Sequence, residues 1–142
     1  MKFAWTTQKF YSALDALGLC QFVWGPSWQL YGPAETVELV QAGTGWDATM
    51  AELLQIGERR INLMRAFNAR EGIGKGADTL PKKMFRPLEG GGPTAGVALT
   101  VEEFERARDA YYQLAGCDPV TGYPTPAKLG ELGLEWVGGM KK

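Results

Sequence analysis

A carboxylate and a thiol stand close together in the segment Asp15-Ala16-Leu17-Gly18-Leu19-Cys20. The carboxylate of Asp15 can accept hydrogen bonds from the N–H groups of a ligand, and the thiolate of Cys20 can bind a soft metal. One cysteine cannot hold an iron–sulfur cluster, which needs four thiolates, and a lone cysteine is more often a small buried apolar residue. The segment is therefore a candidate for one part of a site whose other ligands come from elsewhere.

A helix is expected to carry this segment, because apolar residues recur at helical spacing over residues 7–17. Gly18 is the residue just past the helix end, where a positive φ is needed. Asp15 then lies in the last turn, where its carboxylate faces the negative end of the helix dipole at a cost of about 0.3–1 kcal/mol. An acid in such a place has a partner or a function, or it lies on the solvent side. The apolar face is formed by Phe10, Ala13, Leu14 and Leu17.

A longer helix is predicted from Thr49 to about Arg70. Thr49 and Glu52 form the Thr-x-x-Glu pattern of a capping box, which pairs the first backbone N–H groups of a helix. Gly57 lies in the apolar arc of this helix and permits the close approach of another backbone. The opposite arc is polar. The apolar arc holds Leu53, Leu54, Ile56, Gly57, Ile61, Met64 and Phe67, and the polar arc holds Gln55, Glu58, Arg59, Asn62 and Arg65.

Arg60 is the exception to this division, since it falls inside the apolar arc. The simpler interpretation is an arginine that extends to solvent or pairs with a carboxylate at the edge of the packed face. The other interpretation is a contact to an absent domain or to an anionic cofactor.

Shorter helices are expected on both sides of this long one. Residues 34–41 suit a short helix that buries two valines. Residues 100–103 form a second capping box, which begins a helix that ends at Gly116. A last short helix is expected over residues 125–133, and residues 135–142 are expected to be frayed. The helix that ends at Gly116 is predicted to bury Val101, Phe104, Tyr111, Tyr112 and Ala115.

Loops rich in glycine and proline separate the predicted helices. The longest covers residues 77–98, and a loop of this length in a compact domain indicates an interface or a wrapping segment. Residues 20–33 hold several large aromatics, which more often pack a core or an interface than stack on a ligand. The aromatics are Phe22, Trp24, Trp28 and Tyr31. Because no window alternates polar and apolar residues for long, the sequence predicts an all-α fold: a single irregular helical domain over residues 1–142, with one long central helix and long Gly/Pro-rich loops.

Composition excludes several classes of function. The chain has 142 residues, enough for one domain, with 15 basic and 16 acidic residues and a net charge of −1. No nucleic-acid partner is expected, because such proteins carry a basic excess. No apolar run reaches the length of a membrane span, and the first residues lack the apolar stretch of a secretory signal, so no membrane contact is expected. The absence of histidine excludes Ser-His and Cys-His catalysis and the commonest zinc ligand sets.

The two cysteines, Cys20 and Cys117, stand far apart in the sequence, and their spacing does not call for a disulfide. We expect both to be reduced and the protein to be cytoplasmic. Cys117 is expected to be a structural residue or a chance thiol. Without histidine or a convergent cluster of acids, a complete active site within this chain is not expected.

The segment at Asp15 has the form D-x-x-G-L-C, and further motifs follow it in order. This series resembles the C-terminal region of the tungsten-containing aldehyde ferredoxin oxidoreductase family over most of the chain. The motifs are Gly57-Glu58-Arg59-Arg60-Ile61-Asn62-Leu63, Phe67-Asn68-Ala69-Arg70-Glu71-Gly72, Asp78-Thr79-Leu80-Pro81, Tyr111-Tyr112-Gln113-Leu114-Ala115-Gly116, Gly122-Tyr123-Pro124-Thr125-Pro126 and Leu129-Gly130-Glu131-Leu132-Gly133-Leu134.

The resemblance implies a share in a cofactor site of a longer enzyme that oxidises aldehydes to carboxylic acids and passes electrons to ferredoxin. In that family tungsten, sometimes molybdenum, is bound by two pterin dithiolenes, with a [4Fe-4S] cluster nearby. Asp15 would match the carboxylate that hydrogen-bonds a pterin ring, and Gly18 and Leu19 would match the backbone that approaches it closely. Cys20 would match the fourth ligand of the cluster.

The chain departs from the family in length. Complete enzymes are several times longer, and their three-cysteine cluster motif, their first pterin segment and the acids and histidines near tungsten belong to regions absent here. We therefore expect an excised C-terminal domain or a split subunit. It would need the remaining domains or subunit of the same enzyme, bind neither tungsten nor cluster alone, and be inactive alone. The alternative is a freestanding helical protein-interaction module with no redox role.

Overall fold

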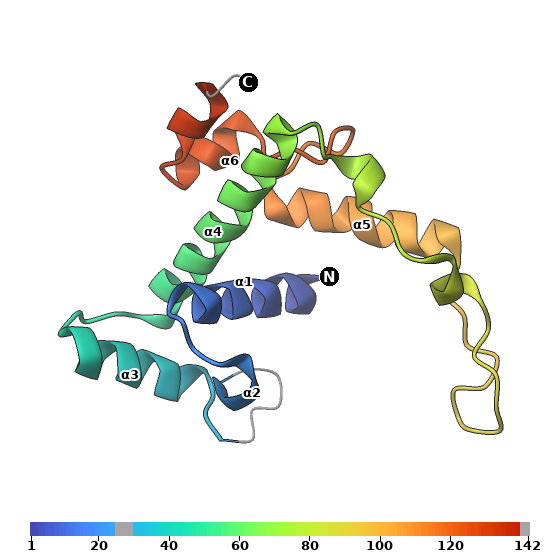
Figure 1. Cartoon of the computed structure of the whole chain (residues 1–142), viewed down its shortest axis with the longest axis horizontal. Helices are drawn as coiled ribbons and strands as arrows, with labels where there is room; N and C mark the ends of the chain where they lie inside the picture. Colours follow the sequence, from blue (N-terminus) through green and yellow to red (C-terminus); the bar gives the residue numbers. More distant parts are fainter. Residues whose placement is uncertain (25–29, 140–142) are drawn as a thin grey trace.

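The chain is built around one long helix, α4 (Met50–Arg70), which lies centrally in the computed structural model (Figure 1). The structure describes residues 1–24 and 30–139. Over these residues the only extended pairing is an isolated bridge between Cys117 and Pro124, so the predicted all-α fold is confirmed. The other elements are α1 (Lys2–Ala16), α2 (Gln21–Trp24), α3 (Pro33–Thr44), α5 (Val101–Ala115) and α6 (Pro126–Glu131), with short 3-10 turns η1 (Lys75–Ala77), η2 (Lys82–Phe85) and η3 (Glu135–Gly139).

The start of α4 is fixed by the predicted capping box. Thr49 Oγ1 accepts a hydrogen bond from the Glu52 backbone N–H at 3.3 Å, and the Glu52 carboxylate accepts one from the Thr49 N–H at 2.8 Å. These bonds satisfy two N–H groups that would otherwise lack partners at the helix start. A further hydrogen bond from the Thr49 hydroxyl to the Glu52 carboxylate at 2.7 Å, followed by the bond from the Thr49 N–H, lowers the pKa of the Glu52 carboxyl. The helix ends at Arg70, as predicted.

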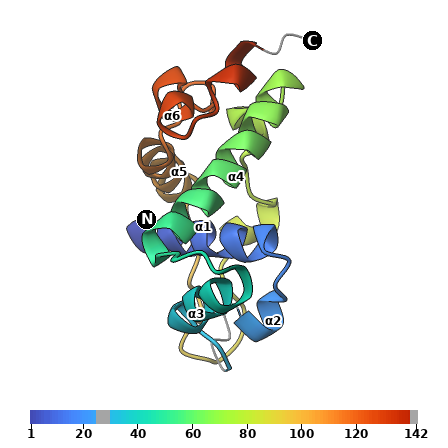
Figure 2. The same ribbon diagram turned by 90° about the vertical axis from the view of Figure 1, so that its left-hand side faces the viewer.

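α1 crosses α4 at Gly57. A Cβ atom at position 57 would lie 1.9 Å from the Lys9 carbonyl oxygen, so only glycine fits between the two backbones. The predicted close approach at Gly57 is therefore confirmed. Figure 2, turned by 90° from Figure 1, shows α1 lying across the N-terminal half of α4.

The buried face of α4 differs from the predicted apolar arc. Met64 and Phe67 are 52% and 55% exposed, whereas Glu58 and Asn62, assigned to the polar arc, are buried. The reason is the crossing of α1 at Gly57. Glu58 is next to Gly57 and Asn62 lies one helical turn further on, so both lie on the packed side of α4 although they are polar. Hydrophobic periodicity alone therefore does not identify the packed face of this helix.

Glu58 is buried between lysines from two other helices. Its Oε2 accepts a hydrogen bond from Lys9 Nζ of α1 at 3.2 Å, and its Oε1 accepts one from Lys128 Nζ of α6 at 3.0 Å. A buried carboxylate is costly without such partners. The side chain therefore links α1, α4 and α6 at one point.

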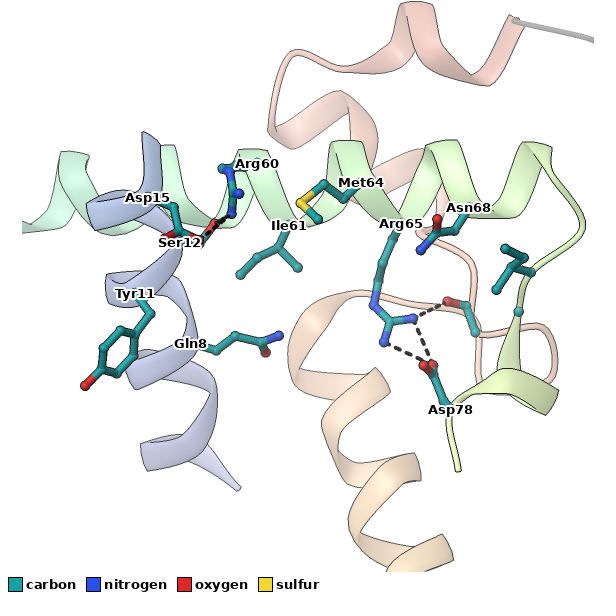
Figure 3. A pocket seen from close by; sticks show the side chains of 13 residues that line it. Gln8, Tyr11, Ser12, Asp15, Arg60, Ile61, Met64, Arg65, Asn68 and Asp78 are labelled. Atoms are coloured by element: carbon teal, nitrogen blue, oxygen red, sulfur yellow. Dashed lines mark hydrogen bonds and ion pairs between the residues drawn. The ribbon is translucent and has the colours of Figure 1, made fainter. Parts of the chain in front are cut away.

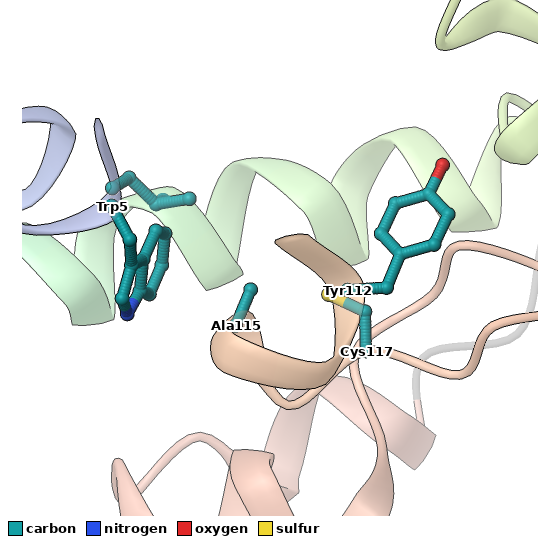
Figure 4. Close-up of a cluster of buried hydrophobic side chains, with 5 residues drawn as sticks. Trp5, Tyr112, Ala115 and Cys117 are labelled. Atoms are coloured by element: carbon teal, nitrogen blue, oxygen red, sulfur yellow. The ribbon is translucent and has the colours of Figure 1, made fainter. Parts of the chain in front are cut away.

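α1 begins at Lys2, earlier than the predicted start at Thr7. Its first turn is held by tertiary contacts, since the Trp5 ring is 6% exposed and meets the Tyr111 ring of α5 edge to face, with centroids 5.4 Å apart. No side-chain cap marks this start, so local sequence does not indicate it. The core cluster formed here contains Trp5, Ile61, Tyr112, Ala115 and Cys117 (Figure 4).

The second capping box begins α5, with bonds of 3.1 and 2.9 Å between Thr100 and Glu103, and Gly116 ends it with φ +69°. Tyr112 and Ala115 are buried as predicted, and Phe104 and Tyr111 are half-buried. The prediction for Val101 is wrong, because it lies in the first turn of α5 at the end remote from the core and is 50% exposed.

The predicted loop over residues 77–98 first runs beside α5 and then extends beyond the N-terminal end of that helix (Figure 1). It contains η2, where the Phe85 ring packs edge-on against Phe104 of α5 with centroids 6.1 Å apart. The predicted short helix over residues 34–41 is present as α3 and buries Val40.

The aromatic segment over residues 20–33 is described in part. Trp24 and Tyr31 stack with centroids 4.6 Å apart, and Phe22 is 93% exposed. Trp28 lies outside the described residues. Phe22 therefore does not pack a core within the part of the chain that the structure describes.

The chain end is more ordered than predicted. Residues 135–139 form η3, whose Val137 packs on the leucine cluster of Leu129, Leu132 and Leu134. The prediction of a frayed end is therefore wrong for residues 135–139, and residues 140–142 lie outside the described part.

The surface of the chain is large for its mass. The accessible surface is 9197 Å², whereas a compact monomer of 15.5 kDa exposes about 7,200 Å². Several of the exposed side chains are large and apolar, among them Phe3 at 79%, Leu30 at 69% and Val120 at 79%. Among the described helices, none is long and apolar enough to span a membrane.

Candidate functional site

The candidate segment lies where α1 ends and the chain turns into α2. Gly18 takes φ +69°, its N–H bonds to the Asp15 carbonyl at 3.2 Å, and the Leu19 N–H bonds to the Leu14 carbonyl at 2.9 Å. These are the two bonds of a Schellman motif, which requires a residue that tolerates positive φ. The predicted role of Gly18 as the residue past the helix end is confirmed.

The same backbone motif ends three other helices. In each case the residue that follows a glycine of positive φ donates its N–H to a carbonyl in the last turn: Ile73 to Asn68 at 2.8 Å, Cys117 to Tyr112 at 2.8 Å, and Leu134 to Leu129 at 2.7 Å. What distinguishes the end of α1 is therefore its side chains.

The Asp15 carboxylate is exposed and has one partner on each oxygen. Arg60 Nη1 of α4 lies 3.2 Å from Oδ2, and Gln21 Nε2 of α2 donates to Oδ1. Arg60 is thus carboxylate-paired, which was the simpler of its two predicted interpretations. The partners also offset the unfavourable position of an acid at the negative end of the α1 dipole.

Cys20 is a free, exposed thiol at the start of α2, and its carbonyl accepts the backbone N–H groups of Val23 and Trp24, both at 3.0 Å. Within the described residues no group of three or more His, Cys, Asp or Glu side chains is placed to hold a metal ion. Leu19 is half-buried, and Gly18 has open space where a Cβ would stand.

A side-chain hydrogen bond spans the turn after α1. Gln21, the residue next to Cys20, reaches back to the Asp15 carboxylate. The segment Asp15–Cys20 therefore presents a carboxylate, an open glycine and an exposed thiol at one end of one helix.

Asp15 also lines a cavity of about 330 Å³ between α1, the C-terminal half of α4 and the segment after it. Sequence reasoning missed most of its wall, because residues on α1 and on the distant α4 meet only after the helices cross. The lining residues are Gln8, Tyr11, Ser12, Asp15, Arg60, Ile61, Met64, Arg65, Asn68, Ile73, Gly74, Asp78 and Gly122.

The far end of the cavity is closed by a polar cluster around Asp78 (Figure 3). Asp78 Oδ2 accepts hydrogen bonds from Arg65 Nη1 and Nη2 at 3.1 and 3.0 Å and from the Tyr112 hydroxyl at 2.6 Å. Burial, together with this bond to Asp78, raises the pKa of the Tyr112 phenol. The cluster links α4, α5 and the loop, because Arg65 of α4 and Tyr112 of α5 both donate hydrogen bonds to Asp78.

Cys117 lies apart from the candidate segment. It is 5% exposed in the core cluster with Trp5 and Tyr112, and burial raises the pKa of its thiol. Both cysteines are free, so they form no disulfide with each other. A buried thiol of raised pKa is a poor metal ligand and nucleophile, which agrees with the structural role predicted for Cys117.

A family profile described as aldehyde ferredoxin oxidoreductase, domains 2 and 3, matches residues 1–134. Proteins named tungsten-containing aldehyde ferredoxin oxidoreductase from Pyrococcus horikoshii and Pyrococcus furiosus are both 34% identical to the chain, over 129 and 128 residues. These matches cover 90% and 89% of this chain but 20% of each relative, so the chain spans about a fifth of the length of the curated relatives it matches.

A solved structure carries the same fold. The active site complex BamBC of benzoyl coenzyme A reductase, bound to 1,5-dienoyl-CoA, contains a chain that matches with a TM-score of 0.73 and 26% identity. The match covers 94% of this chain and 19% of the solved one. The profile match over nearly the whole sequence, together with the identities to the named relatives, means that this chain belongs to the aldehyde ferredoxin oxidoreductase family.

Proposed function

We propose that the chain is the C-terminal, cofactor-contacting domain of a tungsten oxidoreductase, folded as one helical domain over residues 1–142. It supplies one pterin-contacting segment and one iron–sulfur ligand, and it is inactive alone. The observation that carries the proposal is the exposed end of α1, where Asp15 lines a cavity and Cys20 stands free at the surface.

Each residue of the segment has a role suited to its chemistry. The Asp15 carboxylate accepts N–H groups from a pterin ring, since a carboxylate is a strong acceptor of bidentate hydrogen bonds. Gly18 and Leu19 let the ring approach the backbone, and Gly18 has the open space this requires. Cys20 is the fourth thiolate of a [4Fe-4S] cluster, completing a set of three from outside this chain. Bound tungsten and its pterin dithiolenes supply the redox chemistry.

The donor set of the chain fits these groups but is incomplete. Asp15 retains lone pairs beyond its two protein partners, because an ionised carboxylate has about four acceptor sites. A single exposed thiolate fits one corner of a cluster. The remaining ligands must come from the parts of the enzyme that lie outside this fifth of the relatives' length.

The complete enzyme, in this proposal, oxidises an aldehyde to a carboxylic acid and passes electrons to ferredoxin. Support comes from the relatives' names, which specify tungsten, aldehyde and ferredoxin. Molybdenum is the alternative metal. The partners of the chain are the remaining domains or subunit of the enzyme, and the free cysteines suit the reducing cytoplasm.

The test replaces Cys20 and Asp15 in the complete enzyme that contains this chain. Cys20→Ser should lose or alter the electron paramagnetic resonance signal of the reduced cluster and lower its iron and sulfide content. Asp15→Asn should lower the pterin content measured by fluorescence after oxidation. Cys117→Ala is the matched control, because that thiol lies in the core, and it should leave the cluster signal unchanged.

An unaltered cluster in Cys20→Ser and full pterin content in Asp15→Asn would contradict the proposal. Those results would favour the alternative, a helical protein-interaction module without a redox role. The exposed aromatic side chain of Phe22 and the loop over residues 77–98 would then be its contact surface.

A further inference from the structure

Arg60 makes an unusual pair of contacts for a residue inside an apolar arc. A single nitrogen, Nη1, lies 3.3 Å from the Ser12 hydroxyl and 3.2 Å from Asp15 Oδ2. Ser12 and Asp15 stand three residues apart on α1, so the guanidinium rests on one face of that helix (Figure 3). Arg60 therefore fixes one edge of the Asp15 carboxylate from the neighbouring helix.

The contact is poorly explained as a stabilising link. The side chains of Arg60 and Asp15 are 37% and 39% exposed, and an ion pair this open contributes about 0–1 kcal/mol. α1 and α4 are already joined by the close crossing at Gly57 and by the buried pair of Lys9 with Glu58. The helix pair needs no further tie at this point.

The contact is well explained as a means of orienting the carboxylate. Arg60 holds Oδ2, and Gln21 of α2 holds Oδ1, so donors from two different helices fix the plane of the group. One donor on each oxygen leaves one further acceptor site on each. A pair of coplanar acceptors matches the two adjacent N–H donors of an aminopyrimidine edge.

We propose that Arg60 is a positioning residue, which holds the Asp15 carboxylate in the orientation that accepts an aminopyrimidine edge of a pterin. The proposal rests on the proposed role of Asp15. It adds a residue outside the D-x-x-G-L-C segment, and it explains why an arginine interrupts the apolar arc of α4. Gln21 completes the same arrangement from the other side.

The experiment measures pterin content per chain in the complete enzyme, by fluorescence after oxidation, for Arg60→Met and Arg60→Lys. Loss of an orienting bond to a charged group predicts about a tenfold weaker retention of pterin on dilution in Arg60→Met. Arg60→Lys keeps a cation within reach of the carboxylate and should restore most of the retention. The melting temperature of both variants should stay within a few degrees of the parent.

Arg70→Met is the matched control on the same helix. Arg70 pairs with Glu71 at 3.1 Å, with side chains 31% and 33% exposed, away from Asp15. The control variant should keep its pterin. A loss of equal size in Arg70→Met would overturn the proposal.

Two outcomes separate this inference from the function on which it rests. Full pterin content in Arg60→Met, with loss in Asp15→Asn, would overturn the positioning role and leave the proposed function standing. Full content in Asp15→Asn would overturn the proposed pterin contact of Asp15 and, with it, the positioning role of Arg60. A loss in Arg60→Met that comes with a lowered melting temperature and is not rescued by lysine would show a structural link and overturn the positioning role.

Discussion

Individual charged side chains of α4 act as links between helices. Glu58 lies between Lys9 of α1 and Lys128 of α6, and Arg65 binds Asp78 of the following loop. These contacts place polar groups on the packed face of the helix. They are tolerated because each buried charge has an opposite charge within hydrogen-bond distance.

At the residue scale, Gly57→Ala tests the crossing of α1 and α4. The added Cβ would lie 1.9 Å from the Lys9 carbonyl oxygen, so the helices must separate. We expect the free energy of unfolding to fall by about 1–3 kcal/mol, which is the usual cost of adding atoms to a well-packed core. Urea unfolding followed by circular dichroism measures the change.

Gly43→Ala is the matched control for this substitution. Gly43 is also helical, and a Cβ there meets nothing within 4 Å. Alanine at this position should raise the free energy of unfolding by about 0.5–1 kcal/mol through helix propensity. Equal effects of the two substitutions would refute the crossing as the cause.

The sequence allowed some residue roles to be predicted and not others. Gly18 and Gly57 were predictable because glycine at a helix end or in an apolar arc is a local signal. The partner of Arg60 was not, since Ser12 and Asp15 come near it only through the helix crossing. The burial of Asn62 was missed for the same reason, because periodicity does not report which face meets a neighbour.

At the scale of elements, the helices of this chain divide by how they begin. α4 and α5 begin at capping boxes, which are local patterns and were predicted from the sequence. α1 begins without a side-chain cap, and its first turn depends on Trp5 packing against α5. The local sequence thus predicts where α4 and α5 begin, whereas the start of α1 depends on tertiary contacts and cannot be predicted from the local sequence.

The capping box of α4 predicts a dependence of stability on pH. The pKa of Glu52 is lowered from 4.5 in the folded chain, so the ionised carboxylate stabilises the folded state. This contribution is complete above the unfolded pKa and is lost as the pH falls through the folded pKa. Glu52→Gln should therefore have a lower melting temperature than the parent at neutral pH, and this difference in melting temperature should vanish in acid.

Thermal melts of both chains across about pH 2–7 measure this convergence. Glu103→Gln repeats the test at α5, where hydrogen bonds from Thr100 lower the pKa of the carboxyl in the same way. A difference between parent and variant that stays constant with pH would show that the carboxylate charge has no part in capping.

At the scale of the whole molecule, the chain has more surface than its mass requires. It exposes 9197 Å² against about 7,200 Å² for a compact monomer, and large apolar side chains lie on that surface. Its match to a fifth of each relative agrees with a domain that packs against the rest of a larger enzyme.

The isolated chain should therefore bind a hydrophobic dye such as anilinonaphthalene sulfonate, and it should contain neither iron nor tungsten in stoichiometric amount. The reason is that the chain offers one thiolate and an uncovered apolar surface. Fluorescence titration and metal analysis of the purified chain test both statements. Stoichiometric iron or acid-labile sulfide in that preparation would contradict the split of the cluster ligands proposed here.

The Schellman motif that recurs at four helix ends bears on how a functional site can arise in such a domain. Four helices close with one interchangeable backbone turn, in which glycine specifies the geometry and imposes nothing on the neighbouring side chains. If an aspartate and a cysteine were introduced at the corresponding positions around Gly72 or Gly133, their backbone positions relative to each other would match those of Asp15 and Cys20 around Gly18. The backbone turn is thus common to these helix ends, and the side chains next to its glycine determine the chemistry. The same chemistry could therefore be moved to another helix end by substitution, without a change of the backbone.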